Sequence, residues 1–184
     1  MKKIILILIV VLLSYCSTSD YKRPSSDLED AIGRYWKDTA MALAIRNAES
    51  LDGKWTFRFE NTNIYHEKWV QSIPGIKNKF RKYGWYIISS DGDWQIFYPT
   101  ALYNGYKGSP CELQENIFTN AKYGAMIWEY YDRQYANLSD KISAYNHGSP
   151  WFYLDRHKVR CYLNWKYVEL VQTNYRKWRA YERD

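Results

Sequence analysis

The spacing of apolar side chains predicts that the chain begins with a long helix. Apolar residues recur at helical spacing over 32–44, behind the capping pattern Ser-Asp-Leu-Glu at 26–29. We therefore expect one helix over 26–50, ended by Asp52-Gly53. Glu49 would lie in its last turn, where the helix macrodipole slightly disfavours a carboxylate.

A short β region is expected next, because apolar and polar residues then alternate. Trp55, Phe57 and Phe59 alternate with polar residues, which is typical of a strand. A second strand is expected over 85–88, followed by a loop over 90–93.

Helical patterns return in the second half of the chain. Pro99 can begin a short helix that ends near Gly105, and further helices are expected over 112–131, 142–146 and 163–181. The sequence therefore predicts an α+β fold that is predominantly helical, with one small, irregular β region and no internal repeat.

The first residues have the form of an export signal. Lys2 and Lys3 precede an unbroken apolar run over 4–13, which is too short to span a bilayer as a mature helix. The segment Leu13-Ser14-Tyr15-Cys16 resembles a bacterial lipoprotein signal, in which the Cys is lipidated and cleavage occurs just before it. Tyr15 departs from that pattern, because a small residue is usual there. Plain secretion, or a retained anchor with Cys16 unmodified, is the alternative.

This leader predicts how the chain is divided and where it is located. We expect a signal peptide over 1–15, a lipidated polar tether over 16–26 and one domain over 27–184. The protein would be held to a membrane of the cell envelope by its lipid, facing the periplasm or cell wall. In this oxidising compartment Cys111 and Cys161 could form a disulfide or remain buried free thiols.

The aromatic content makes carbohydrate one candidate class of ligand. The chain has 19 Tyr and 9 Trp but a mean hydropathy of -0.61, so many rings should lie in partly wet places. Flat rings with a polar group stack on sugar faces and donate hydrogen bonds. The alternative is that these rings only fill the core.

The charge favours an anionic partner without indicating nucleic acid. The net charge is +6, and +4 once the two leader lysines are removed, which suits a membrane surface or an acidic wall polymer. No block of consecutive basic residues argues for nucleic acid. His66, His147 and His157 lack a metal-ligand spacing, and we find no phosphate-binding loop or Ser/His/Asp arrangement, so no metal or cofactor is expected.

Four short segments resemble, in order, the motifs of the soluble lytic transglycosylase and goose-type lysozyme family. They are Ala44-Ile45-Arg46-Asn47-Ala48-Glu49-Ser50, Gly92-Asp93-Trp94-Gln95-Ile96, Asn120-Ala121-Lys122-Tyr123-Gly124 and Ala144-Tyr145-Asn146-His147-Gly148. They are similar to the family's helix ending in Glu-Ser, its Gly-Leu-Met-Gln-Ile segment, its Asn-x-x-x-Gly helix and its Ala-Tyr-Asn-x-Gly segment. Tyr167-Val168, with Val171 and Tyr175, is similar to the closing helix.

The resemblance implies a lysozyme-like fold, with the β region beside a cleft, and a monomeric enzyme acting on peptidoglycan glycan strands. Glu49 would be the single acid and base of a lytic transglycosylase that cleaves the MurNAc-GlcNAc β-1,4 bond. The substrate's N-acetyl group would stabilise the positive centre, and the sugar's 6-hydroxyl would attack to give a 1,6-anhydro end. Such an acid must hold a proton near neutral pH, which requires a desolvated site.

The resemblance also implies the other residues of the site. Tyr145 would be catalytic, either by orienting Glu49 or by stabilising developing charge. Residues expected to bind substrate are Ser50, Gln95, Asn146 and, on a segment resembling that of phage-type members, Glu60 and Tyr65. Glu60 could instead be structural and pair with Arg58 or Arg46, and the Gln95 side chain could satisfy backbone groups of its loop.

Departures from the family pattern leave other functions open. Asp93-Trp94 replaces the usual apolar pair before Gln95. Asp91 or Asp93 could activate water, which would make the protein a hydrolytic goose-type muramidase. We favour a loop role for both, because Asp is common beside Gly in turns. An inactive peptidoglycan-binding lipoprotein is a further alternative.

Overall fold

The computed structural model describes residues 25–181, so the leader and the expected lipidation site Cys16 lie outside the described residues. The described part is predominantly helical with a small antiparallel sheet, which confirms the expected class of fold. Its first helix begins at Ser25, so the last residues of the tether expected over 16–26 are helical. Within 25–181 no helix is long and apolar enough to cross a membrane.

The single helix expected over 26–50 is wrong, because the chain forms two helices there. Helix α2 spans Ser25–Tyr35 and α3 spans Thr39–Ser50. Asp38 between them has an extended backbone, and its Oδ1 accepts a hydrogen bond from the N–H of Met41 at 3.0 Å. This N-cap starts a new helix, although the apolar spacing runs through the break.

The sheet has three short antiparallel strands in the order β1-β2-β3, namely β1 Phe57–Phe59, β2 Ser89–Asp91 and β3 Ile96–Phe97. The first lies where the alternation predicts it. The second strand expected over 85–88 is wrong: a 3-10 helix, η2, spans Gly84–Ile87. Ile87 and Ile88 are both fully buried, so side chains do not alternate there. Ser90 and Asp91, expected in a loop, belong to β2.

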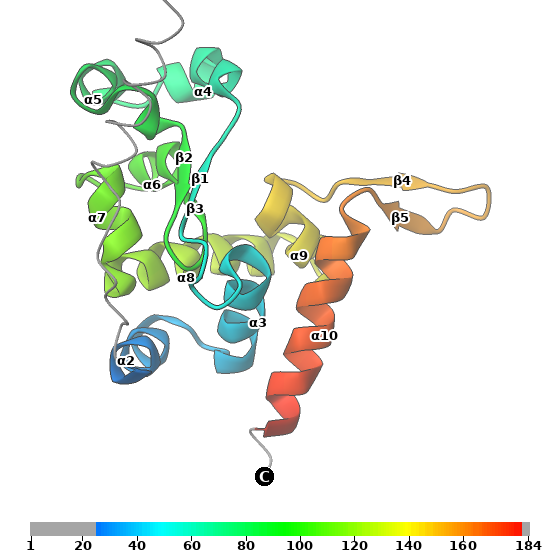
Figure 1. Cartoon of the computed structure of the whole chain (residues 1–184). Helices are drawn as coiled ribbons and strands as arrows, with labels where there is room; N and C mark the ends of the chain where they lie inside the picture. The colour runs from blue at the N-terminus through cyan, green and yellow to red at the C-terminus, as the bar shows by residue number, and fades with distance from the viewer. Residues whose placement is uncertain (1–24, 182–184) are drawn as a thin grey trace, which may run out of the picture.

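The segment between β1 and η2 forms three short helices that the sequence pattern does not predict. They are η1 Thr62–His66, α4 Lys68–Gln71 and α5 Ile76–Tyr83. Each is too short to establish a clear apolar period. Figure 1 shows α4 and α5 above the sheet, at the opposite end of the sheet from α3.

The second half of the chain contributes five helices, α6 Tyr98–Tyr103, α7 Pro110–Glu115, α8 Ile117–Gln134, α9 Leu138–His147 and α10 Trp165–Tyr181. The helix expected over 112–131 is divided at Asn116, which caps α8 by accepting the N–H of Thr119 at 2.9 Å. A hairpin of β4 (Phe152–Leu154) and β5 (Arg160–Tyr162), not predicted from the sequence, projects from the body of the molecule (Figure 1).

The core is organised around Trp94, which is fully buried. Its indole N–H donates to the backbone oxygen of Ala42 at 2.9 Å, and its ring stacks on Trp36 with centroids 5.7 Å apart. Asn120 of α8 accepts the backbone N–H of Trp94 at 2.9 Å and donates to the backbone oxygen of Asp91 at 2.7 Å. One buried amide therefore holds both ends of the β2–β3 turn.

The two cysteines of the described part do not form a bond with each other. Cys161, on β5, is a free thiol that is partly exposed. It is therefore neither deeply buried nor joined to Cys111.

Candidate active-site cleft

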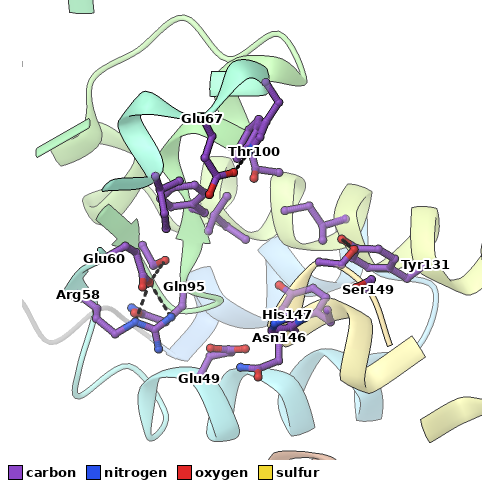
Figure 2. A pocket seen from close by; sticks show the side chains of 18 residues that line it. Glu49, Arg58, Glu60, Glu67, Gln95, Thr100, Tyr131, Asn146, His147 and Ser149 are labelled. Atoms are coloured by element: carbon purple, nitrogen blue, oxygen red, sulfur yellow. Dashed lines mark hydrogen bonds and ion pairs between the residues drawn. The ribbon is translucent and has the colours of Figure 1, made fainter. Parts of the chain in front are cut away.

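A cleft of about 540 Å³ lies between the sheet and the ends of α8 and α9 (Figure 2). Its size falls in the usual range for ligand sites. It is lined by Glu49, Arg58, Glu60, Ile64, Glu67, Trp69, Ser90, Gln95, Ile96, Phe97, Thr100, Ile127, Tyr131, Tyr145, Asn146, His147, Gly148 and Ser149. The lining is mixed in character, with carboxylates, amides and aromatic rings, which is suited to a polar ligand with flat faces.

Glu49 reaches the cleft from the last turn of α3, as the sequence predicts. The helix ends just after it, because Leu51 has a left-handed backbone with φ 50° and its N–H bonds to the carbonyl of Asn47. The hydroxyl of Tyr167, on α10, donates a hydrogen bond to Glu49 Oε1 at 2.6 Å. Since α10 packs along α3, this hydrogen bond joins two elements that are already in contact.

The surroundings of Glu49 favour its protonated form. Burial, which strips water from the carboxylate, raises the pKa of Glu49 to about 7, even though part of the side chain faces the cleft. The negative charge of Glu60 acts in the same direction. The hydrogen bond from Tyr167, the charge of Arg58 and a hydrogen bond from Asn146 lower the pKa without cancelling the effect of burial. A carboxyl of this kind can give and take a proton near neutral pH.

Tyr145 lies in the cleft wall, but its hydroxyl does not bind Glu49. It donates to the backbone oxygen of Trp94 at 3.2 Å. Burial, and next the charge of Glu49, raise the pKa of Tyr145 well above its usual value, so the phenol is neutral. The tyrosine whose hydroxyl orients Glu49 is Tyr167, which the sequence places only on the face of the last helix.

Gln95 and Asn146 both line the cleft, as the sequence predicts (Figure 2). The Gln95 amide donates to the backbone oxygens of Trp55 at 3.1 Å and Gly92 at 3.0 Å, so its NH₂ group is used by backbone carbonyls of the surrounding loops. Asn146 lies beside Glu49, and its Oδ1 accepts a hydrogen bond from Asn164 at 3.1 Å. Asn146 is therefore held at the rim of the cleft with its amide group near the acid.

Two residues that we expected to bind substrate lie outside the cleft lining. Ser50 is fully buried; its Oγ donates to the backbone oxygen of Arg46 at 3.0 Å and accepts the N–H of Gly53 at 2.9 Å. Its hydroxyl therefore fixes the end of α3. Tyr65 stacks on Phe80 with ring centroids 4.6 Å apart and belongs to an aromatic cluster beside α5.

A charged group on the sheet faces Glu49 across the cleft (Figure 2). Glu60 accepts hydrogen bonds at Oε1 from Arg58 Nε at 2.8 Å and from Ser90 Oγ at 2.6 Å. The pairing with Arg58, considered as an alternative from the sequence, is thus present, but Glu60 still lines the cleft. Ser90 is a lining residue that the sequence alone does not single out, and the sequence names Arg58 only as a possible partner of Glu60.

Asp91 and Asp93 are absent from the cleft lining. Asp93 is buried, and its Oδ2 accepts a hydrogen bond from Arg46 Nε at 2.7 Å. Asp91 lies on β2 beside Ser90, so its side chain points to the other face of the sheet. Burial raises the pKa of Asp91 well above its usual value, against a hydrogen bond from Ser89. Neither carboxyl is placed to activate water opposite Glu49.

Glu67 lies at the end of the cleft farthest from Glu49 (Figure 2), and it is hydrogen-bonded to an aromatic lining residue, Trp69. Trp69 of α4 donates its indole N–H to Glu67 Oε2 at 2.7 Å and contacts the Phe97 ring edge-on at 6.1 Å between centroids. Both Trp69 and Glu67 lie in the segment of short helices that the sequence pattern does not predict. This end can therefore stack a flat polar ligand such as a sugar ring.

Among residues 25–181 no group of three or more His, Cys, Asp or Glu side chains is placed to hold a metal ion. Comparison with models of known protein families, with curated proteins and with solved structures finds no match. The family resemblance therefore rests on the sequence motifs alone.

Proposed function

We propose that the chain is a peptidoglycan lytic transglycosylase of lysozyme-like fold, with Glu49 as its single acid and base. The observation that carries the proposal is the state of Glu49. It is a carboxyl on a cleft floor with a pKa of about 7, oriented by a tyrosine hydroxyl. Near neutral pH such a group is present in both the acid and the base form.

The proposed reaction uses both forms in turn. Glu49 donates its proton to the oxygen between MurNAc and GlcNAc, and the bond from that oxygen to the anomeric carbon breaks. The substrate's N-acetyl group stabilises the positive carbon. The 6-hydroxyl oxygen then bonds to this carbon and its proton passes to the Glu49 carboxylate. The product has a 1,6-anhydro end, and the acid is restored without water being consumed.

The arrangement of the four motif segments supports the proposal. The first, second and fourth segments contribute Glu49, Gln95 and Asn146 to one cleft. The third contributes Asn120, whose amide holds the turn that carries Gln95. Residues of segments far apart in the sequence thus meet at one cleft, which supports the proposal.

Hydrolysis is the second candidate function, and Glu60 is the observation that favours it. Glu60 is a second carboxylate facing the cleft and could activate a water molecule. Its Oε1 already accepts hydrogen bonds from Arg58 and Ser90, so this oxygen is engaged and is less accessible to a water molecule. We therefore prefer the reaction that needs Glu49 alone.

The test is mass spectrometry of fragments released from purified peptidoglycan sacculi by the wild type, Glu49→Gln and Glu60→Gln. We expect 1,6-anhydro ends from the wild type and from Glu60→Gln, and at least a roughly hundredfold loss of rate for Glu49→Gln. Reducing ends that disappear in Glu60→Gln would support the hydrolytic muramidase. A wild type that binds sacculi but releases nothing would support an inactive binding protein.

We also propose that the enzyme is anchored in the cell envelope through lipid on Cys16. The support is the leader sequence alone. Metabolic labelling with a fatty acid should mark the wild-type chain and leave Cys16→Ser unlabelled. Equal labelling of both chains would refute the anchor without affecting the proposed chemistry.

A further inference from the structure

The β4–β5 hairpin has one face that is attached to the body of the protein. Tyr162 donates to Asp140 Oδ1 at 2.6 Å, and Arg160 forms an ion pair with the same carboxylate. The Arg160 guanidinium also lies over the Phe152 ring, 4.8 Å from its centroid. These contacts fix the hairpin to α9, so the projecting element in Figure 1 has a defined orientation.

The opposite face of the hairpin is apolar and exposed. The pairing of Tyr153 with Cys161, and the hydrogen bond from Leu163 N–H to the Trp151 carbonyl at 2.8 Å, place these side chains on one face. Trp151 is 43%, Tyr153 56%, Leu163 50% and Val159 58% exposed. We call Trp151, Tyr153, Val159 and Leu163 the outer face. Exposed apolar groups gathered on one surface are typical of a binding site.

The tip of the hairpin is polar and basic. Asp155 Oδ1 accepts the backbone N–H groups of His157 and Val159, each at 2.8 Å, and this closes the turn. Arg156 and Lys158, on either side of His157 in this turn, add two positive charges. A hairpin that enters a bilayer would need an apolar tip, because buried charge is costly there. Here the apolar side chains lie along one side of the hairpin and the positive charges lie at its tip. This arrangement favours an anionic ligand that lies along the hairpin.

The outer face adjoins the cleft. His147 lines the cleft, and its ring stacks on Trp151 with centroids 4.5 Å apart and planes 10° apart. Ser143 of α9 accepts the N–H of Trp151 at 2.9 Å and donates to Asn164 at 2.8 Å. Asn164 in turn binds Asn146 of the cleft. A polymer leaving the cleft beside His147 therefore meets the outer face next.

We propose that the outer face is a second binding site for the peptidoglycan strand, continuous with the catalytic cleft. Trp151 and Tyr153 stack on sugar rings, and Arg156 and Lys158 bind carboxylates of the peptide stems. This inference rests on the proposed function and extends it, because it makes long, stem-bearing polymer the preferred substrate. Short glycan fragments would occupy the cleft alone.

The test compares two double variants of the full chain in the Glu49→Gln background, which should bind sacculi without cutting them. One is Trp151→Ala/Tyr153→Ala. The matched control is Trp85→Ala/Tyr103→Ala, which removes rings that are 44% and 69% exposed elsewhere. We expect about tenfold weaker binding to sacculi in a cosedimentation assay for the hairpin variant only, because Trp and Tyr are enriched among the residues that dominate binding energy at interfaces. The loss should be smaller for a soluble tetrasaccharide. Circular dichroism checks that each variant is folded.

Equal binding of sacculi by the two double variants would overturn this inference. So would a loss confined to phosphatidylglycerol vesicles, which would identify a membrane surface. A change from dimer to monomer in the hairpin variant, with sacculus binding kept, would identify an interface between copies and would also overturn it. The proposed function fails separately, if the wild type releases no 1,6-anhydro fragments.

Discussion

Glu49 keeps its proton in the folded protein over a pH range in which the unfolded chain has lost it. Its folded-state pKa is about 7, compared with an ordinary value of 4.5. Between these values Glu49 binds more protons in the folded state, so its contribution to the free energy of unfolding falls as pH rises from about 4.5 to about 7. Above this window the full penalty remains, on the order of 3 kcal/mol for a shift of this size.

Glu49→Gln should therefore stabilise the protein at pH 8 and leave its stability nearly unchanged at pH 4. The amide keeps the shape and can still accept the Tyr167 hydrogen bond, but it carries no charge. We expect a gain of about 1–3 kcal/mol at pH 8, measured by urea unfolding across the pH range. Glu169→Gln on the exposed side of α10 is the control. A gain that does not depend on pH would contradict the raised pKa.

Tyr167→Phe should make Glu49 a weaker acid still. The hydroxyl bound to Oε1 lowers the pKa, so its removal raises the pKa of Glu49 above about 7. The alkaline limb of the pH–rate profile should then move to higher pH. Tyr175→Phe is the matched control, because that hydroxyl binds Asp38 at 2.9 Å from the same helix. If both variants shift the limb equally, Tyr167 has no specific effect on the acid.

Among the secondary-structure elements, α8 depends on a glycine where it crosses the core. A Cβ added at Gly124 would lie 3.1 Å from atoms of Trp36 and Trp94, and Trp94 is fully buried and cannot move aside. We expect Gly124→Ala to destabilise the protein by about 1–2 kcal/mol in thermal unfolding. Gly33→Ala, which meets nothing within 4 Å in α2, should instead stabilise by about 0.5–1 kcal/mol. Equal effects of the two changes would refute this account of the core.

The elements whose signals are local could be predicted, and those set by packing could not. Strand β1, helix α10 and the second half of α9 follow from apolar spacing and turn residues, whereas α9 begins at Leu138, four residues before the helix expected over 142–146. The break before α3 depends on the Asp38 cap, which apolar spacing cannot reveal. The β4–β5 hairpin is fixed through Asp140, a contact between residues distant in the sequence.

The same distinction applies to the site. Glu49, Gln95 and Asn146 could be named from the sequence because each lies in a recognisable motif segment, and all three line one cleft. Ser50 lies in a motif too, but helix geometry turns its hydroxyl toward the backbone of α3. The bond from Tyr167 to Glu49 depends on how α10 packs along α3, and no local pattern encodes this packing.

The whole molecule brings the acid and the charges that tune it together from separate elements. Glu49 comes from α3, Arg58 from β1 and Glu60 is the residue that directly follows β1. Arg58 lowers the pKa of Glu49 and Glu60 raises it, across the cleft. The ion pair between them, with Arg58 Nη2 2.7 Å from Glu60 Oε1, keeps these opposing charges close together. The pKa of Glu49 therefore depends on Arg58 and Glu60 together, and their two effects oppose each other.

Removing either charge should shift the pKa of Glu49 in a known direction. Arg58→Gln leaves Glu60 uncompensated, so the pKa should rise; Glu60→Gln leaves Arg58 uncompensated, so the pKa should fall. NMR titration of the Glu49 carboxyl carbon measures both shifts without requiring activity. Both should shrink as salt is raised, because the cleft is open to solvent. Lys37→Gln, which breaks an ion pair with Glu129 outside the cleft, should leave the titration unchanged. Shifts of the same sign in both cleft variants would mean that altered structure, and not charge, sets the acid.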